Sequence, residues 1–175
     1  MSPARRIATA AITAVLLAGT PGLAMAATPQ TTLPSLQTEE WRRFSVWPPP
    51  NLPARNLDVD SSGRVVVSTP DPTSERQQWS LSTEGGLPVI KNRATGTCLT
   101  APDDTLDPVT VQTCDKNNPS QRWDVRYVTS SQVEISPPAH GSLALTGGAQ
   151  AGSNQVVLRP YTAAEIQQWS IRSVK

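Results

Sequence analysis

The motif Gln-x-Trp occurs three times in this 175-residue chain, and its spacing restricts the fold more than any other feature. The three copies are Gln77-Gln78-Trp79, Gln121-Arg122-Trp123 and Gln167-Gln168-Trp169. Successive Trp residues lie 44 and 46 positions apart. A period of this length indicates that one unit of several short elements is built three times.

Other apolar residues fall into step when the repeats are aligned on the Trp. The shared leucines are Leu57, Leu99 and Leu145, provided that the first repeat is shorter by two residues, and the shared valines are Val67, Val111 and Val157. The repeat therefore extends well beyond the three-residue motif.

The fold class predicted for these units is all-β. Residues 64–69, 108–113 and 154–159 are short runs rich in Val, Thr and Gln, and turn-forming residues separate them at 60–63, 101–104 and 146–148. Helical periodicity is nearly absent, and we expect one helical turn just before Trp169. A propeller needs about four blades, and the Val, Thr and Pro content excludes a helical solenoid. A small barrel of three four-stranded units, capped by hairpins, needs only three repeats and is built of strands.

We expect Trp79, Trp123 and Trp169 to form the centre of this barrel. A buried indole removes a large apolar area from water, and its N–H then needs an acceptor. The Gln two residues earlier brings an amide that can bridge backbone groups of a turn. The alternative, in which the Gln or the Trp contacts a ligand, stays open at this point.

The first 26 residues have the pattern of a secretory signal peptide. Arg5 and Arg6 precede an apolar run over 7–18, and the sequence Ala-Met-Ala at 24–26 is a cleavage site. The run is shorter than the ~20 residues of a membrane span, although a retained anchor is the alternative. We expect a secreted, extracellular protein with a flexible lead-in over 27–40 and one domain over 41–175.

Charge gives no indication of a nucleic-acid or membrane partner. The chain has 15 basic and 14 acidic residues, and loss of Arg5 and Arg6 would leave 13 against 14, a net charge of −1. No basic field remains to attract nucleic acid or an acidic membrane surface.

Two cysteines, Cys98 and Cys114, are expected to form a disulfide, because an exported chain is oxidised outside the cytosol. Two free thiols are the alternative. His140, the single histidine, has no nucleophile motif near it, and no cluster of metal ligands or phosphate-binding loop is present. We therefore expect neither an enzyme nor a cofactor or metal site.

The three Gln-x-Trp motifs, with the stretch from Gly96 to Trp123 that contains both cysteines, resemble the repeats of ricin-type β-trefoil lectins. The resemblance covers about residues 41–175 and implies a β-trefoil of three pseudo-symmetric lobes that binds galactose-type or related sugars, up to one per lobe. In that family, an Asp accepts bonds from sugar hydroxyls, an aromatic ring covers the apolar face of the sugar, and a polar side chain next to the motif completes the site.

Carrying these roles over residue by residue gives an incomplete site in each lobe. The Asp place holds Asp58, Thr100 and Thr146; the ring place holds Ser68, Gln112 and Leu158; the polar place holds Arg76, Ser120 and Ile166. The candidate carbohydrate-binding residues are Asp58, Gln77, Thr100, Gln112, Gln121, Thr146 and Gln167. Asp58 and Asp60 also fit a turn around residues 60–63. For Trp47, core packing is favoured over a ring supplied from outside the matched places.

Two functions follow from this sequence. The first is a secreted, non-catalytic carbohydrate-binding module with degenerate sugar sites. The second is a trefoil without sugar affinity that binds a protein, for example as the accessory or cell-attachment chain of a secreted toxin or enzyme complex.

Overall fold

Twelve short strands form the framework of the described part of the chain. The computed structural model describes residues 39–47, 53–83, 86–105, 107–148 and 153–175. Lobe one contains β1 (Trp41–Val46), β2 (Arg55–Val59), β3 (Val65–Ser68) and β4 (Trp79–Ser82). Lobe two contains β5 (Val89–Asn92), β6 (Cys98–Thr100), β7 (Thr110–Gln112) and β8 (Asp124–Tyr127). Lobe three contains β9 (Val133–Ser136), β10 (Leu143–Gly147), β11 (Val156–Pro160) and β12 (Trp169–Ser173).

Short 3-10 turns are the helical elements among the described residues. Three of them, η1 (Glu75–Gln77), η2 (Pro119–Gln121) and η4 (Glu165–Gln167), each end two residues before a motif Trp, and η3 (Pro138–His140) lies before β10. The helical turn expected before Trp169 is thus present. Within the described ranges, no helix has the length and apolar character needed to cross a membrane. The predicted signal peptide, and the lead-in up to residue 38, lie outside the described residues.

The outer strands of the lobes form a closed ring. β1 pairs antiparallel with β12 and β4, β4 pairs with β5, and β9 pairs with both β8 and β12. The two outer strands of lobe two, β5 and β8, do not pair with each other. The backbone N–H of Trp123 spans the gap between them by donating to the Pro88 carbonyl at 3.0 Å. Ring closure leaves these strands without the open edges that promote aggregation.

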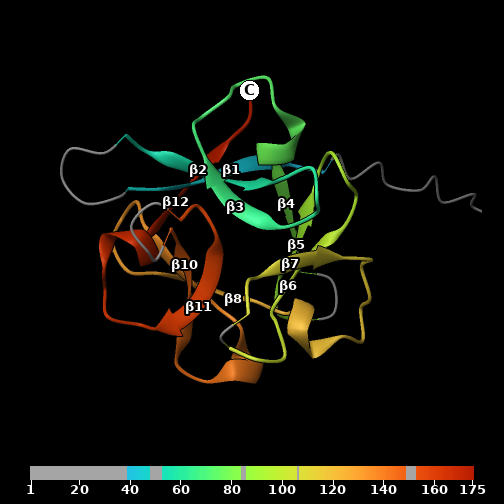
Figure 1. Ribbon diagram of the computed structural model, residues 1–175, viewed down its shortest axis with the longest axis vertical. Coiled ribbons are helices and arrows are strands. Elements are labelled where there is room, and N and C mark those ends of the chain that lie inside the picture. Colours follow the sequence, from blue (N-terminus) through green and yellow to red (C-terminus); the bar gives the residue numbers. More distant parts are fainter. Residues whose placement is uncertain (1–38, 48–52, 84–85, 106, 149–152) are drawn as a thin grey trace, which may run out of the picture. The chain divides into compact units, whose positions relative to one another are not determined.

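The inner strands form three hairpins that meet one another. β2 pairs with β3, β6 with β7, and β10 with β11. Backbone hydrogen bonds then join the hairpins, from Val65 N–H to Val109 O and from Val109 N–H to Val156 O. Figure 1 shows the result, with lobe one at the top, lobe two at the lower right and lobe three at the lower left. The predicted all-β trefoil of three four-stranded lobes is confirmed.

The three motif Trp residues lie at the centre, each fully buried. Each indole N–H donates to the carbonyl of a leucine in its own lobe: Trp79 to Leu57 at 3.0 Å, Trp123 to Leu99 at 3.0 Å and Trp169 to Leu145 at 2.9 Å. A buried indole without such an acceptor would lose the free energy of an unsatisfied donor. The same bond therefore fastens each hairpin to its part of the ring.

Gly147 lies within β10 and against this core, although residues 146–148 had the pattern of a turn. A Cβ on Gly147 would lie 2.9 Å from Val67 Cγ1 and 3.2 Å from the Trp169 ring, so only glycine fits there. The turn begins one residue later, at Gly148, whose φ of +65° favours glycine.

The register of lobe three differs by one residue from the register predicted. Leu57 pairs with Val67, Leu99 with Val111 and Leu145 with Leu158, so Leu158 replaces Val157 as the counterpart of the two valines. The cause is a segment between β11 and Trp169 that is one residue shorter than in the other lobes. Side chains in a strand alternate between faces, so this shift moves Leu158 into the core and brings Arg159 to the outer position.

The disulfide expected between Cys98 and Cys114 is present, and the two Cα atoms lie 5.0 Å apart. It joins the start of β6 to the residue two beyond β7, across the hairpin of lobe two. The corresponding residues of lobe one are Asn56 and Pro70, so lobe two alone among the described lobes has this covalent link.

Removal of this bridge should destabilise the protein without changing its fold. A loop of this length contributes about 3 kcal/mol in the chain-entropy model. We expect the double variant Cys98→Ala/Cys114→Ala to have a free energy of unfolding lower by about that amount, measured by urea unfolding. Its far-UV circular dichroism spectrum should be unchanged. Alkylation of the unreduced parent protein should add no mass; modification of two thiols would contradict the assignment.

Candidate functional site

The Gln of each motif is buried beneath the surface of its lobe. Gln77, Gln121 and Gln167 are at most 2% exposed. In every lobe the side-chain oxygen accepts from a backbone N–H of the loop after the second hairpin strand. The side-chain nitrogen donates to a carbonyl at the start of this loop or, in lobe three, at the end of the strand. For Gln121 these partners are Asp115 N at 2.8 Å and Thr113 O at 3.0 Å. Both polar atoms are thus occupied, and the amide holds the loop against η2.

Each Gln nitrogen also donates to the residue at the Asp place. Thr100 accepts from Gln121, and Thr146 accepts from Gln167, each at 3.1 Å. Both threonines are buried, and each hydroxyl donates in turn to a carbonyl within its own strand, at 2.9 Å. In lobes two and three the Thr therefore completes the hydrogen bonds of the Gln beneath the surface.

Lobe one differs, because Asp58 occupies this place and is only partly buried. Its Oδ2 accepts from Gln77 Nε2 at 3.0 Å, and its Oδ1 accepts from the Val59 N–H at 2.7 Å. A carboxylate has about four acceptor positions, so these two bonds fix the group and leave capacity for further donors. Gln77 is itself fixed by Asn56, which donates to its side-chain oxygen at 2.9 Å.

Asp60, two residues on, is a turn residue. Its Oδ1 accepts from the N–H groups of Ser62 and Arg64, and its Oδ2 accepts from Arg64 Nε at 2.8 Å. Burial raises the pKa of Asp60, but these donors and the Arg64 charge outweigh it, so the pKa lies below its ordinary value. The turn interpretation thus fits Asp60, whereas the bond to Gln77 distinguishes Asp58.

The ring place of each lobe follows from the observed register. Ser68 pairs opposite Asn56, Gln112 opposite Cys98 and Arg159 opposite Ala144. Gln112 is exposed on β7, as a ligand-binding residue would be. Leu158, assigned to this place from the sequence, lies in the core, and that assignment was wrong. The aromatic residue that covers a sugar is therefore replaced by a polar or charged side chain at all three places.

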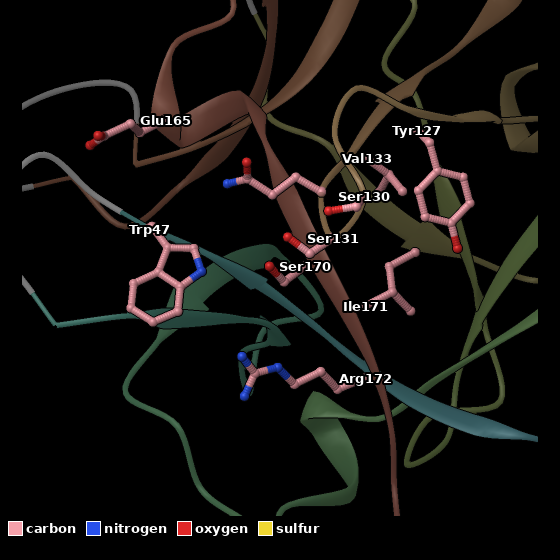
Figure 2. Close-up of a pocket in the computed structure, with 10 residues that line it drawn as sticks. Trp47, Tyr127, Ser130, Ser131, Val133, Glu165, Ser170, Ile171 and Arg172 are labelled. Carbon is pink, nitrogen blue, oxygen red and sulfur yellow. The ribbon is translucent and has the colours of Figure 1, made fainter.

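Trp47 was expected in the core, and the structure places it on the surface, 44% exposed. It lines an open pocket of about 710 Å³ together with Tyr127, Ser131, Glu165, Ser170 and Arg172, among others. We call this hollow the β12 pocket. Figure 2 shows Trp47 and Tyr127 on opposite sides of it, with the serines between them.

One feature of the sequence indicates this pocket, although it lies outside the Gln-x-Trp motif and the matched sugar-binding places. Trp47 follows Val46, which pairs with Trp169, and the counterpart of Trp47 in lobe two is Arg93, which follows the Asn92 that pairs with Trp79. An aromatic residue where lobe two has a charged one indicates a surface specific to one lobe. Tyr127, which is 75% exposed at the end of β8, has no aromatic counterpart either.

No group of three or more His, Cys, Asp or Glu side chains that could hold a metal occurs among the described residues. His140, at the end of η3, is half-buried.

A family described as ricin-type β-trefoil lectin domain-like matches residues 75–169. The chain belongs to this family. The match begins in η1 and ends at Trp169, so it includes all three Gln-x-Trp motifs. Among curated proteins no sequence matches the chain.

Solved structures confirm the fold. The designed three-fold symmetric protein ThreeFoil is 19% identical over 75% of this chain and 96% of its own, with a TM-score of 0.61. A ricin B-like lectin from Macrolepiota procera, in complex with lactose, is 14% identical over 76% of this chain and 94% of its own, also with a TM-score of 0.61.

Other similar structures are longer proteins. The chain spans 33% of an endo-β-galactosidase from Clostridium perfringens that releases GlcNAcα1-4Gal, with 12% identity over 78% of this chain and a TM-score of 0.65. At these identities the comparisons establish the shared β-trefoil fold.

Loss of the buried amide should destabilise a lobe far more than loss of an exposed one. We expect Gln121→Ala to lower the free energy of unfolding by about 2 to 4 kcal/mol, because Asp115 N–H, Thr113 O and the Thr100 hydroxyl lose a buried partner. Gln112→Ala, on the exposed face of the same lobe, is the matched control and should change it by less than about 0.5 kcal/mol. Urea unfolding measures both, and equal effects would contradict the structural role.

Proposed function

We propose that this protein is a non-catalytic carbohydrate-binding module and that its family-type sugar site lies in lobe one, at Asp58. The observation that carries the proposal is a partly exposed carboxylate held by Gln77 and the Val59 N–H, with acceptor capacity left over. Two neighbouring hydroxyls of a galactose-type sugar present the donors that such a carboxylate accepts. Membership of a lectin-like family supports binding rather than catalysis.

Exposed polar groups close to Asp58 supply further contacts. Arg76 lies at the polar place, is exposed, and donates to the Val59 carbonyl at 3.4 Å. Ser68 at the ring place offers a hydroxyl instead of an aromatic face. A site made in this way would depend on hydrogen bonds rather than on stacking, so we propose weak binding by a single lobe.

The second function, protein binding by a trefoil without sugar affinity, is favoured by one specific observation. The ring place holds Ser68, Gln112 and Arg159, and a threonine has replaced the carboxylate in two lobes. The proteins similar in fold include a mosquitocidal holotoxin, of which this chain spans 18%, so trefoils also occur as parts of larger toxins. An accessory or cell-attachment role is the corresponding proposal.

Substitution of the carboxylate separates these two functions. Asp58→Asn should abolish the signal of the protein on an array of neutral galactose-type glycans, because the amide cannot accept from two hydroxyls as the carboxylate does. The melting temperature should fall by only a few degrees, since the Asn oxygen can still accept from Gln77 and only the partly exposed bond from the Val59 N–H is lost. Asp124→Asn, the same substitution at an exposed carboxylate on β8, serves as the control for a surface change outside the site.

Two outcomes would contradict the lobe-one site. A variant that binds as well as the parent would remove Asp58 from the binding role. A parent protein that binds no neutral glycan, yet co-purifies with a protein that free sugars do not elute, would favour the second function.

We also propose that the chain is exported and cleaved after Ala26. The charged start, the apolar run and the Ala-Met-Ala site support this, and the disulfide between Cys98 and Cys114 is consistent with an oxidising compartment. N-terminal sequencing of the protein recovered from a producing culture should begin at Ala27. Recovery of the uncleaved chain only from cells would overturn the proposal.

A further inference from the structure

The junction between lobe three and lobe one contains a charge arrangement that the other two junctions lack. Where β12 pairs with β1, Arg172 lies directly opposite Arg43. The corresponding pair between β8 and β9 is Arg126 with Glu134, joined by a salt bridge of 2.6 Å. Like charges directly opposite one another in a sheet are destabilising, so this junction keeps two cations together at a cost.

The corresponding pair between β4 and β5, Ser82 with Val89, is uncharged. The pair between β4 and β5 is therefore neutral, and in the pair between β8 and β9 the two charges compensate each other. Only between β12 and β1 do two positive charges, Arg172 and Arg43, face each other.

Neither arginine forms an ion pair with an acidic side chain among the described residues, although the Arg43 charge helps to lower the pKa of Asp71, after the hydrogen bonds from Thr73. Arg43 donates through Nη2 to the Pro72 carbonyl at 2.6 Å, and its buried Nε has no hydrogen-bond partner. Arg172 is exposed and forms no ion pair or side-chain hydrogen bond within the described ranges. By contrast, the Glu134 carboxylate raises the pKa of Arg126 by accepting its hydrogen bond and by its charge.

A second difference at the same junction opens the β12 pocket. At the junction of lobe one with lobe two, Arg93 pairs with Glu75 at 3.0 Å, donates to Gln78 at 2.7 Å and lies over the Trp41 ring. At the junction of lobe three with lobe one, the corresponding residues are Trp47 and Glu165, which cannot form such a bridge. Arg93 and Trp41 line a hollow of about 360 Å³, half the size of the 710 Å³ hollow beside Trp47.

Arg172 and Trp47 belong to two hollows at once. Besides the β12 pocket, both line an adjoining hollow of about 360 Å³ that also contains Arg43. Figure 2 shows the Arg172 guanidinium and the Trp47 indole on the same side of the β12 pocket, with Glu165 at another edge. An anionic group beside Arg172 would thus also approach Arg43, whereas Glu165 faces a different part of the ligand.

We propose that the β12 pocket and the adjoining hollow form a binding site for an acidic saccharide, separate from the lobe-one site at Asp58. Arg172 binds the carboxylate of the sugar as a planar two-donor group, and Arg43 adds a second positive charge. The indole of Trp47 covers the apolar face of a sugar ring. Glu165 and the hydroxyls of Ser131 and Ser170 accept from and donate to the ring hydroxyls.

A saccharide fits this lining better than a purely anionic ligand does. A simple anion would use the arginines alone and would be repelled by Glu165. A ligand that carries one carboxylate, several hydroxyls and an apolar face uses every kind of group in the pocket. The pocket volume also falls within the range of about 300 to 1,000 Å³ that is usual for small-molecule sites.

The test compares two oligosaccharides that differ only in the terminal residue, glucuronic acid in one and glucose in the other. Isothermal titration with the protein recovered from a producing culture should show tighter binding of the acidic probe, weakened by added salt. Arg172→Ala should weaken the binding of the acidic probe by about tenfold or more, because a charge-assisted bond is lost. The preference for the acidic over the neutral probe should then disappear. Arg172→Lys, which keeps the charge without the two-donor geometry, should fall between the parent and Arg172→Ala.

Matched variants identify the contributions of ring and charge. Trp47→Ala should weaken both probes, and Trp47→Phe should restore most of the binding. Arg159→Ala removes one positive charge from the same lobe but lies outside the pocket, so it should leave both affinities unchanged. Thermal melts check that each variant is folded, which is expected because Arg172 and Trp47 are exposed.

The outcomes distinguish this site from the lobe-one site. Asp58→Asn should leave the acidic probe unaffected, so loss of either activity alone can be assigned to its own site. Equal affinity of the parent for the two probes, or an acidic affinity unchanged by Arg172→Ala, would overturn the proposal. Binding of an acidic peptide in preference to the acidic sugar would overturn it as well.

Discussion

The hydrogen bond from each central indole to a leucine carbonyl is the contact on which the architecture depends. The ring strands and the hairpins have few residues each, and neither could bury a core alone. The Trp lies at the start of a ring strand while its acceptor lies in a hairpin strand, so one bond per lobe fixes the two layers together. Three such bonds, one in each lobe, fix the hairpins to the ring strands around the pseudo-three-fold axis.

The motif Gln extends this arrangement outward and explains how the trefoil persists when a binding residue is lost. Its amide needs an acceptor at one place in the second strand of the lobe. A carboxylate satisfies it in lobe one, and a threonine hydroxyl satisfies it in lobes two and three. The scaffold therefore requires an acceptor oxygen there, whereas sugar binding requires an accessible carboxylate. Stability and recognition can change independently at this position.

The repeat of Trp, Gln and Leu predicted the fold, because each of these residues has one structural partner that recurs in every lobe. The position of Leu158 was predicted wrongly because a one-residue deletion leaves no trace in a short apolar run such as Val-Val-Leu. The β12 pocket was beyond prediction for a different reason. Trp47 and Arg172 are 125 positions apart in the sequence, and only the pairing of β1 with β12 brings them together.

That pairing also determines when the domain can fold. β1 has its longest partner in β12, with five residue pairs, and the Val174 N–H donates to the Trp41 carbonyl at 2.8 Å. During synthesis, β1 therefore cannot complete its pairing with β12 until Ser173 has left the ribosome. Until then, the ring is open and the first strand lacks its main partner.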